Sequence, residues 1–176
     1  MNAADRDSDQ QVAVLVRRIA AALVAKSARI AVAESCTGGW ITKALSDLPG
    51  CSGWFGYGFV AYSDEAKQDL LGVSAETIAV HGAVSQDVAE QMATGARLES
   101  AAEIAVAVTG IAGPGGGSSR KPVGTIHWAV AYPGGDAALM KHLAGDRDKI
   151  RAHAACIALD LVRRTLLRIH PGLRRA

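Results

Sequence analysis

Hydrophobic residues along the chain follow two spacings, and the alternation of these spacings predicts helices and strands in turn. Apolar residues three or four positions apart mark one face of a helix, whereas short unbroken apolar runs are typical of buried strands. The expected helices cover residues 10–26, 40–48, 64–71, 74–80, 85–98 and 146–169. The expected strands cover residues 30–33, 55–62, 103–109, 124–132 and 137–143.

The order of these elements predicts the fold class. Helices alternate with strands in the first half, which favours a parallel sheet between two layers of helices, and two strands follow one another near the end. We therefore expect an α/β protein, a three-layer α/β/α sandwich with a mixed, mostly parallel sheet. A chain of 176 residues suits a single domain. We place this domain at residues 9–170, between a flexible N-terminal tail (1–8) and a short basic tail (171–176).

The overall composition is that of an ordinary globular protein, with 49% hydrophobic and 20% charged residues. A net charge of +2 argues against a nucleic-acid binder that relies on bulk charge. No apolar stretch approaches the ~20 residues that span a membrane, and the polar N-terminus lacks the apolar core of a secretion signal. The three widely spaced cysteines suit free thiols in a reducing compartment. We therefore expect a cytoplasmic protein.

The first candidate for chemistry is the segment AESCTGG at residues 33–39, between an expected strand and an expected helix. Such a junction aims backbone N–H groups and the positive end of a helix dipole at one point, where a negative charge is stabilised. Ser35 and Cys36 are both possible nucleophiles. The amides that could hold an oxyanion belong to Cys36, Thr37, Gly38 and Gly39. The alternative is that Ser35 and Thr37 only cap the helix and the glycines permit a tight turn.

Lys67 is a candidate base for such a nucleophile. The five histidines show no obvious partner pattern, so a Ser-His-Asp triad has little support. A desolvated lysine can replace the histidine of a triad. Lys67 follows the strand end at Tyr62 by five residues and could act in this way if the fold brings it to Ser35. Otherwise it is an ordinary solvated lysine.

Two further segments could bind an anion. The densest run of glycines allows the backbone to approach a ligand closely and to point N–H groups at it. Its candidate residues are Thr109, Gly110, Gly113, Gly115 and Gly116. Arg147 and Arg151 lie four positions apart near the start of the last helix, so they share a face and could clamp a phosphate. The alternatives are a mobile surface loop and a solvated helix start.

Five motifs, taken together and in this order, resemble one family. They are AESCTGG at 33–39, FVAYSDEAK at 59–67, HGAVS at 81–85, AVTGIAGPGG at 107–116 and KPVGT at 121–125. They look like the C-terminal domain of the competence/damage-inducible protein CinA, whose stand-alone members are nicotinamide-nucleotide amidohydrolases. The resemblance covers residues 10–168.

The resemblance implies hydrolysis of nicotinamide mononucleotide to nicotinic acid mononucleotide and ammonia, without a metal or other cofactor. It implies a serine nucleophile and a lysine base, which map onto Ser35 and Lys67, and it adds Tyr62 to the substrate-binding residues. We expect a small-molecule nucleotide as the partner, no nucleic acid, no membrane, and a homo-oligomer.

The sequence departs from the family pattern at two places. Asp64 stands where the pattern usually has asparagine, and Ala154 and Ala155 stand where it often has threonine. A carboxylate at position 64 could weaken the binding of a phosphate. Two other functions stay open at this point: a non-catalytic nucleotide-binding or regulatory module, and an amidohydrolase that uses Cys36 in place of Ser35.

Overall fold

The computed structural model of the chain describes residues 3–170. Its helices are α1 (Ala3–Ala25), α2 (Trp40–Ser46), the short 3-10 helix η1 (Cys51–Gly53), α3 (Asp64–Leu71), α4 (Ala75–His81), α5 (Gln86–Ser100) and α6 (Arg147–Ile169). Its strands are β1 (Ile30–Glu34), β2 (Phe55–Val60), β3 (Ile104–Gly110), β4 (Thr125–Tyr132) and β5 (Gly135–His142). Every helix and strand expected from the sequence is present.

The beginning of α1 is the largest difference from the sequence-based expectation. The helix starts at Ala3, so residues 3–8 are helical rather than a flexible tail. Apolar spacing begins only at Val12, which is why the preceding polar turns were missed, although acidic residues are favoured near a helix N-terminus. Residues 1–2 and the expected basic tail at 171–176 lie outside the described residues.

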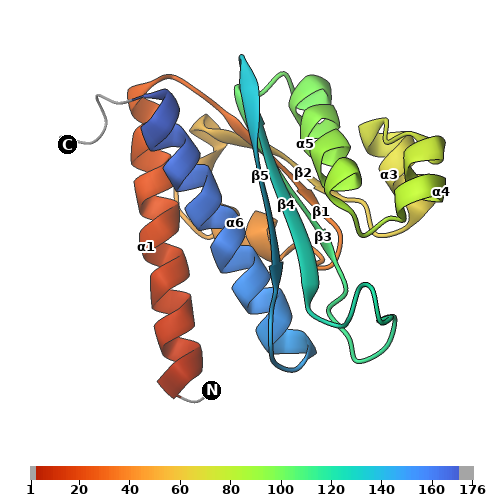
Figure 1. Cartoon of the computed structure of the whole chain (residues 1–176). Helices are drawn as coiled ribbons and strands as arrows, with labels where there is room; N and C mark the ends of the chain where they lie inside the picture. Colours follow the sequence, from red (N-terminus) through yellow and green to blue (C-terminus); the bar gives the residue numbers. More distant parts are fainter. Residues whose placement is uncertain (1–2, 171–176) are drawn as a thin grey trace.

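The sheet has five strands in the order β2-β1-β3-β4-β5. β1 pairs in parallel with both β2 and β3, whereas β4 pairs antiparallel with β3 and β5. Only β4 therefore runs against the other four strands. Helices α3, α4 and α5 cover one face, and α1 and α6 cover the other (Figure 1). The expected α/β fold with a mixed, mostly parallel sheet is confirmed.

The two faces of the sheet differ in side-chain size because β1 and β3 alternate branched residues with alanine. Ile30 and Val32 pack with α1 and α6, whereas Ala31 and Ala33 face α5. The small alanine side chains allow α5 to pack closely on the sheet. The close fit extends to Gly95 of α5, where a Cβ atom would come within 1.8 Å of a backbone oxygen of α3.

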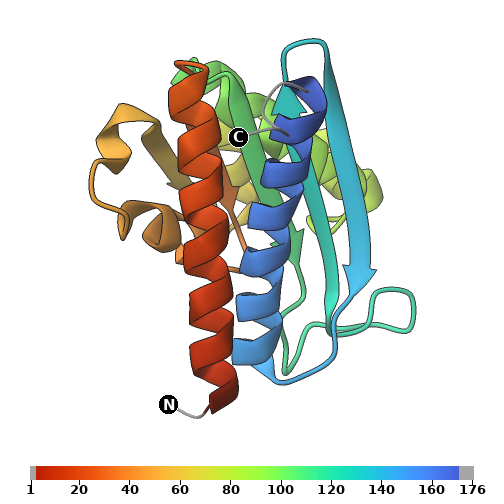
Figure 2. The same ribbon diagram turned by 90° about the vertical axis from the view of Figure 1, so that its left-hand side faces the viewer.

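The long helices α1 and α6 lie side by side along one face (Figure 2). Val16, Ile19 and Leu23 of α1 are buried in the same hydrophobic cluster as Ala155 and Leu159 of α6. Across residues 3–170, no helix is both long enough and apolar enough to cross a membrane.

After β1 and after β2, the chain turns toward opposite faces of the sheet. The connection after β1 leads to α2, which packs in the cluster of α1 and α6, while the connection after β2 leads to α3 on the other face. In open α/β sheets, ligands bind at the carboxyl ends of strands where the connections diverge in this way. The ends of β1 and β2 are therefore the first place to look for a functional site.

Candidate functional site

Ser35 lies at the carboxyl end of β1, between the ends of both neighbouring strands. Its amide donates to the Val108 carbonyl of β3 over 3.0 Å, and the Ala61 amide donates to the Glu34 carbonyl over 2.9 Å. Ser35 and Cys36 are both buried. These backbone hydrogen bonds on both sides fix the position of Ser35 at the carboxyl end of β1.

Glu34 caps the helix that follows Ser35. Its fully buried carboxylate accepts from the amides of Gly39, Ile41 and Thr42 at 3.0, 3.1 and 2.7 Å. A carboxylate is stabilised at this position because free N–H groups and the helix dipole meet there. The positive end of α2 is thus occupied by the protein itself, so it is not free to bind a ligand anion.

This cap narrows the choice of oxyanion donors. The amide of Gly39 is bonded to Glu34, and the amide of Gly38 donates to the Ser35 carbonyl over 3.1 Å. These two expected donors are therefore engaged elsewhere. The amides of Cys36 and Thr37 donate no hydrogen bond among the described residues, and they remain the candidates for holding an oxyanion.

Lys67 of α3 is buried although it is a lysine, with only 1% of its surface exposed. Its Nζ donates to the backbone carbonyls of Tyr62 and Ser63 at 3.0 and 3.2 Å. Burial lowers the pKa of Lys67, whereas the negative charge of Asp64, 4.0 Å away, raises it. A neutral amine has two N–H groups, which these two carbonyls can accept, and a lone pair that remains free to take a proton.

Lys67 belongs to the same end of the domain as Ser35. The Ala61 amide donates to the carbonyl of Glu34, the residue before Ser35, and Lys67 Nζ donates to the carbonyl of Tyr62, the residue after Ala61. Within residues 3–170, no hydrogen bond joins Lys67 to Ser35 directly. Catalytic hydrogen bonds are often long until substrate is bound, so this geometry is compatible with a pair that closes on the substrate.

The surroundings of Cys36 favour the protonated, unreactive form of its thiol. Burial raises its pKa to about 12, and the negative charge of Glu34 acts in the same direction. The thiolate is the reactive form of cysteine, and reactive cysteines have lowered pKa values. Burial therefore disfavours the thiolate of Cys36, the form in which a cysteine acts as a nucleophile.

The two candidate arginines project from α6 and hold different parts of the site. Arg147 donates to the Gly113 carbonyl over 2.8 Å and to the Tyr62 hydroxyl over 3.0 Å. Arg147 thus joins the segment after β3, which contains Gly113, to the segment after β2, which contains Tyr62. Its side chain is exposed, which leaves the guanidinium accessible to a ligand.

Arg151 holds the loop that follows β1. It donates to the Thr37 carbonyl over 2.8 Å and lies over the ring of Trp40, 5.5 Å from its centre. A cation over an indole face is attracted by the ring electrons. Trp40 was not among the expected site residues, since its apolar spacing indicated only a helix face.

The glycine-rich loop, defined here as residues 111–124, begins at the carboxyl end of β3 and connects β3 to β4. Gly113 and Gly116 adopt positive φ angles of 78° and 83°, which glycine adopts easily. Gly115 is open, since a Cβ atom there would meet nothing within 4 Å. These positions leave a stretch of backbone accessible to an anion.

Two of the expected binding residues, Thr109 and Gly110, have structural roles instead. The Thr109 hydroxyl donates to the Ala83 carbonyl over 2.8 Å. Gly110 lies so close to Ile126 that a Cβ atom would come within 2.3 Å of its side chain. Thr109 therefore ties β3 to the α4–α5 connection, and Gly110 allows β3 and β4 to pack.

Lys121 anchors the glycine-rich loop and was not among the expected site residues. Its Nζ donates to the carbonyls of His81 and Val84, each over 2.6 Å. The loop is thereby fastened to the connection between α4 and α5. In the sequence, only its place in the KPVGT motif hinted at a role.

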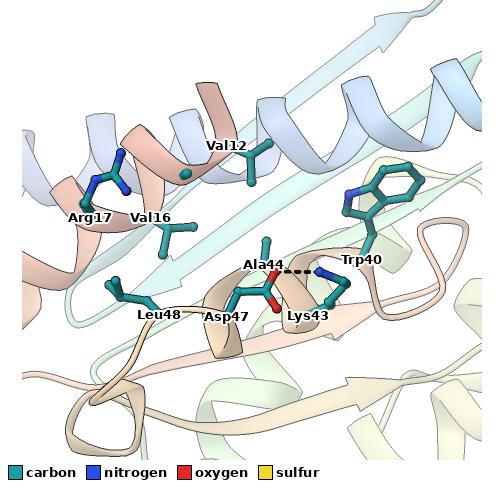
Figure 3. A pocket seen from close by; sticks show the side chains of 9 residues that line it. Val12, Val16, Arg17, Trp40, Lys43, Ala44, Asp47 and Leu48 are labelled. Carbon is teal, nitrogen blue, oxygen red and sulfur yellow. Dashed lines mark hydrogen bonds and ion pairs between the residues drawn. The ribbon is translucent and has the colours of Figure 1, made fainter. Parts of the chain in front are cut away.

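A separate cavity of about 300 Å³ lies between α1 and α2 (Figure 3). Val12, Val16 and Leu48 supply apolar walls, and Lys43 and Asp47 form an ion pair of 2.6 Å at its rim. Its lining contains neither Ser35 nor Lys67. The cavity therefore lies apart from the two candidate catalytic residues, and Trp40 is the one site residue that lines it.

Fold and site together define a three-layer α/β domain with a buried serine, a buried lysine and a glycine-rich loop at the carboxyl edge of its sheet. Residues 12–166 match the family described as the CinA C-terminal domain. The chain belongs to this family, and the resemblance seen in its motifs is confirmed.

Similarity to individual proteins extends over most of the chain. It is 46% identical over 154 residues to the nicotinamide-nucleotide amidohydrolase PncC of Escherichia coli (strain K12), a match covering 87% of this chain and 93% of PncC. It is 49% identical over 148 residues to a CinA-like protein of Anaeromyxobacter sp. (strain K), covering 84% of this chain but 36% of that protein. The crystal structure of the competence/damage inducible protein CihA from Agrobacterium tumefaciens has a TM-score of 0.85 at 43% identity, covering 89% of this chain and 95% of CihA.

Proposed function

We propose that this chain hydrolyses the carboxamide of nicotinamide mononucleotide, giving nicotinic acid mononucleotide and ammonia. The observation that carries the proposal is its similarity to PncC, an amidohydrolase acting on nicotinamide nucleotides, along nearly the whole length of both proteins. The enzyme class, an amidohydrolase, follows from that similarity. A cytoplasmic location is part of the proposal, supported by three cysteines that form no disulfide.

The proposed mechanism uses Ser35 as the nucleophile and neutral Lys67 as the base. Lys67 takes the hydroxyl proton while Ser35 Oγ attacks the carboxamide carbon, and the amides of Cys36 and Thr37 stabilise the oxyanion. The ammonium of Lys67 then gives this proton to the amide nitrogen of the substrate as the C–N bond breaks. Ammonia leaves, and an acyl-serine ester remains. Water, deprotonated by Lys67, hydrolyses the ester and restores Ser35.

The burial of Lys67 supports this mechanism over a non-catalytic nucleotide-binding module. Removing an ammonium from water is unfavourable, so lysines are almost never fully buried unless they are paired, and the burial of Lys67 needs an explanation. A module that only binds nucleotides gains nothing from a lysine whose pKa is lowered by burial. A general base gains directly, because only the neutral amine accepts a proton.

The phosphate of the substrate is assigned to Arg147 and the open backbone of residues 113–117. A guanidinium and several amides are a common combination for phosphate recognition. Arg147 already bonds the Gly113 carbonyl and the Tyr62 hydroxyl. This places its charge between the glycine-rich loop and the segment leading to Lys67.

The deciding experiment measures ammonia release from nicotinamide mononucleotide by the purified full chain. We expect release by the wild type and its loss in Ser35→Ala, with free nicotinamide as a poor substrate because it lacks the phosphate. A correctly folded wild-type protein that releases no ammonia from the nucleotide would overturn the proposed function. Release that persists in Ser35→Ala would retain the function but exclude the serine mechanism.

A further inference from the structure

The cavity of about 300 Å³ between α1 and α2 plays no part in the proposed reaction. Its volume is at the lower end of the range of small-molecule sites, which is about 300–1,000 Å³. Most of its wall is aliphatic, and the side chains that form this part are Val12, Ala13, Val16, Ala44 and Leu48. Ligand sites commonly combine such walls with a small number of polar groups. The cavity therefore has the size and lining of a site for a small ligand.

The polar groups of the cavity are mainly hydrogen-bond donors. Arg17 and Lys43 carry positive charges, and Trp40 contributes an indole N–H. Figure 3 shows the indole nitrogen on the side of the ring that faces the other lining residues, with no hydrogen bond to any of them. The single carboxylate, that of Asp47, already accepts from Lys43 over 2.6 Å. Two cations against one anion leave a positive charge, which favours a ligand with one negative charge.

We propose that this cavity is a second ligand site, separate from Ser35 and Lys67, and that it binds a small aromatic carboxylate. An aromatic ring packs favourably against aliphatic walls and against an indole. The carboxylate accepts hydrogen bonds from the donors of Arg17, Lys43 and Trp40. A neutral ligand of the same shape would gain only the apolar contacts, and a cationic ligand would be repelled by the two positive side chains.

Trp40 connects the cavity to the loop that follows β1. The Arg151 guanidinium lies 5.5 Å from the centre of the Trp40 ring and donates to the Thr37 carbonyl over 2.8 Å. The amide of Thr37 is one of the two proposed oxyanion donors. A ligand that fits the cavity stabilises the arrangement of the chain in which the cavity exists. Occupancy therefore favours the positions of Trp40 and Arg151 that hold this loop.

Tryptophan fluorescence with benzoate as the probe tests the site independently of the proposed activity. Trp54 and Trp128 are buried, whereas Trp40 is only partly buried, so a ligand in the cavity should change mainly the emission of Trp40. We expect a saturable change with a Kd of about 1 mM, as suits a ligand of this size. Benzyl alcohol, which has the same ring without the charge, should bind about tenfold more weakly.

Filling the cavity provides a matched pair of variants. Ala13→Leu places extra carbon atoms inside the cavity and should abolish benzoate binding without changing any charge. Ala21→Leu adds the same atoms to the same helix at an exposed position outside the lining, so it should bind as the wild type does. Circular dichroism checks that both variants are folded. Absence of saturable binding by the wild type up to about 10 mM benzoate, or unchanged binding by Ala13→Leu, overturns the proposal.

Steady-state kinetics test the connection to the catalytic loop, and this part rests on the proposed function. Benzoate should raise kcat/KM for nicotinamide mononucleotide by about fivefold and then reach a plateau, because the coupling between two sites is finite. It should have no effect on Ala13→Leu. An apparent KM that rises without limit would place benzoate at the catalytic centre, and that result or an unchanged kcat/KM overturns the connection. Absence of ammonia release would contradict only the proposed function, because the fluorescence titration measures the cavity by itself.

Discussion

Asp64 Oδ1 lies 4.0 Å from Lys67 Nζ, one helical turn away on α3. The two groups differ in environment, since Lys67 is buried and the Asp64 side chain is half exposed. Burial lowers the pKa of Lys67 and the Asp64 charge raises it. The carboxylate thus partly opposes the activation of the proposed base. The family pattern usually has asparagine at this position, which carries no charge.

Replacing Asp64 by asparagine should shift the pH dependence of the reaction toward lower pH. The neutral amide no longer stabilises the ammonium, so the pKa of Lys67 falls further. Because Lys67 accepts a proton only when neutral, kcat/KM should rise at lower pH than in the wild type. The pH profile of kcat/KM for nicotinamide mononucleotide measures this shift. Asp69→Asn, an exposed carboxylate on the same helix, should leave the profile unchanged, and a shift toward higher pH in Asp64→Asn would contradict the assignment.

Lys67→Met should lower kcat by about 10²- to 10⁴-fold, the contribution of a general base. The same substitution should change the pH dependence of stability. The pKa of Lys67 is lower in the folded chain than its usual 10.5, so the folded state disfavours the ammonium. Wild-type stability is then lost, relative to Lys67→Met, as pH falls below 10.5 toward the folded-state pKa. Thermal unfolding of both proteins from pH 10 to pH 7 measures the difference, and a wild type that gains on the variant as pH falls would refute the buried-base assignment.

Ser35→Ala should abolish ammonia release, whereas Cys36→Ala should retain a large part of it. The reason is that the Cys36 thiol stays protonated, with its pKa raised to about 12 by burial. Wild-type activity should therefore resist iodoacetamide at neutral pH. Rapid inactivation by iodoacetamide that Cys36→Ala abolishes would instead identify the cysteine as the nucleophile.

Local signals in the sequence were sufficient for the elements and several of their caps. Ser85 and Asp146, at the starts of two expected helices, cap α5 and α6 by accepting from the amides of Val88 and Lys149. Apolar runs located β1, β3 and β4 because a buried strand needs apolar residues on both faces. Motif resemblance drew Ser35 and Lys67 together as a proposed pair, which neither residue indicates alone.

Hydrogen bonds between residues that are not close neighbours along the chain could not be predicted from the sequence. The amides capped by Glu34 belong to residues up to eight positions ahead, and Thr109 bonds a carbonyl 26 residues before it. A polar residue looks the same in the sequence whether its side chain binds a ligand or bonds the protein's own backbone. Only the three-dimensional structure shows that the Thr109 hydroxyl and the Gly39 amide already have partners within the protein. They are therefore distinguished from polar groups that are free to bind a ligand.

Arg147→Ala should raise KM for nicotinamide mononucleotide by about 10- to 100-fold, the equivalent of about 1.5–3 kcal/mol for a hydrogen bond to a charged group. Nicotinamide riboside, which lacks the phosphate, should show a much smaller change. Steady-state kinetics with both substrates measure this contrast. Arg164→Ala provides the control on the same helix, since Arg164 pairs with Asp160 and its side chain is largely exposed. Equal losses on both substrates would mean that Arg147 does not bind the phosphate.

Lys121→Met should loosen the glycine-rich loop without removing any group assigned to the chemistry. Lys121 donates two hydrogen bonds of 2.6 Å, to the carbonyls of His81 and Val84, and methionine can donate neither. The amides of residues 111–124 should then exchange their hydrogens faster, because the loop opens at a lower free-energy cost. KM for the nucleotide should rise by about tenfold, which corresponds to a loss of about 1.4 kcal/mol, while kcat should change little. Lys141→Met, on the exposed edge strand β5, should alter neither quantity. A raised KM with unchanged hydrogen exchange would show that Lys121 contacts the substrate instead of anchoring the loop, and no change in either would show that other contacts hold the loop in place.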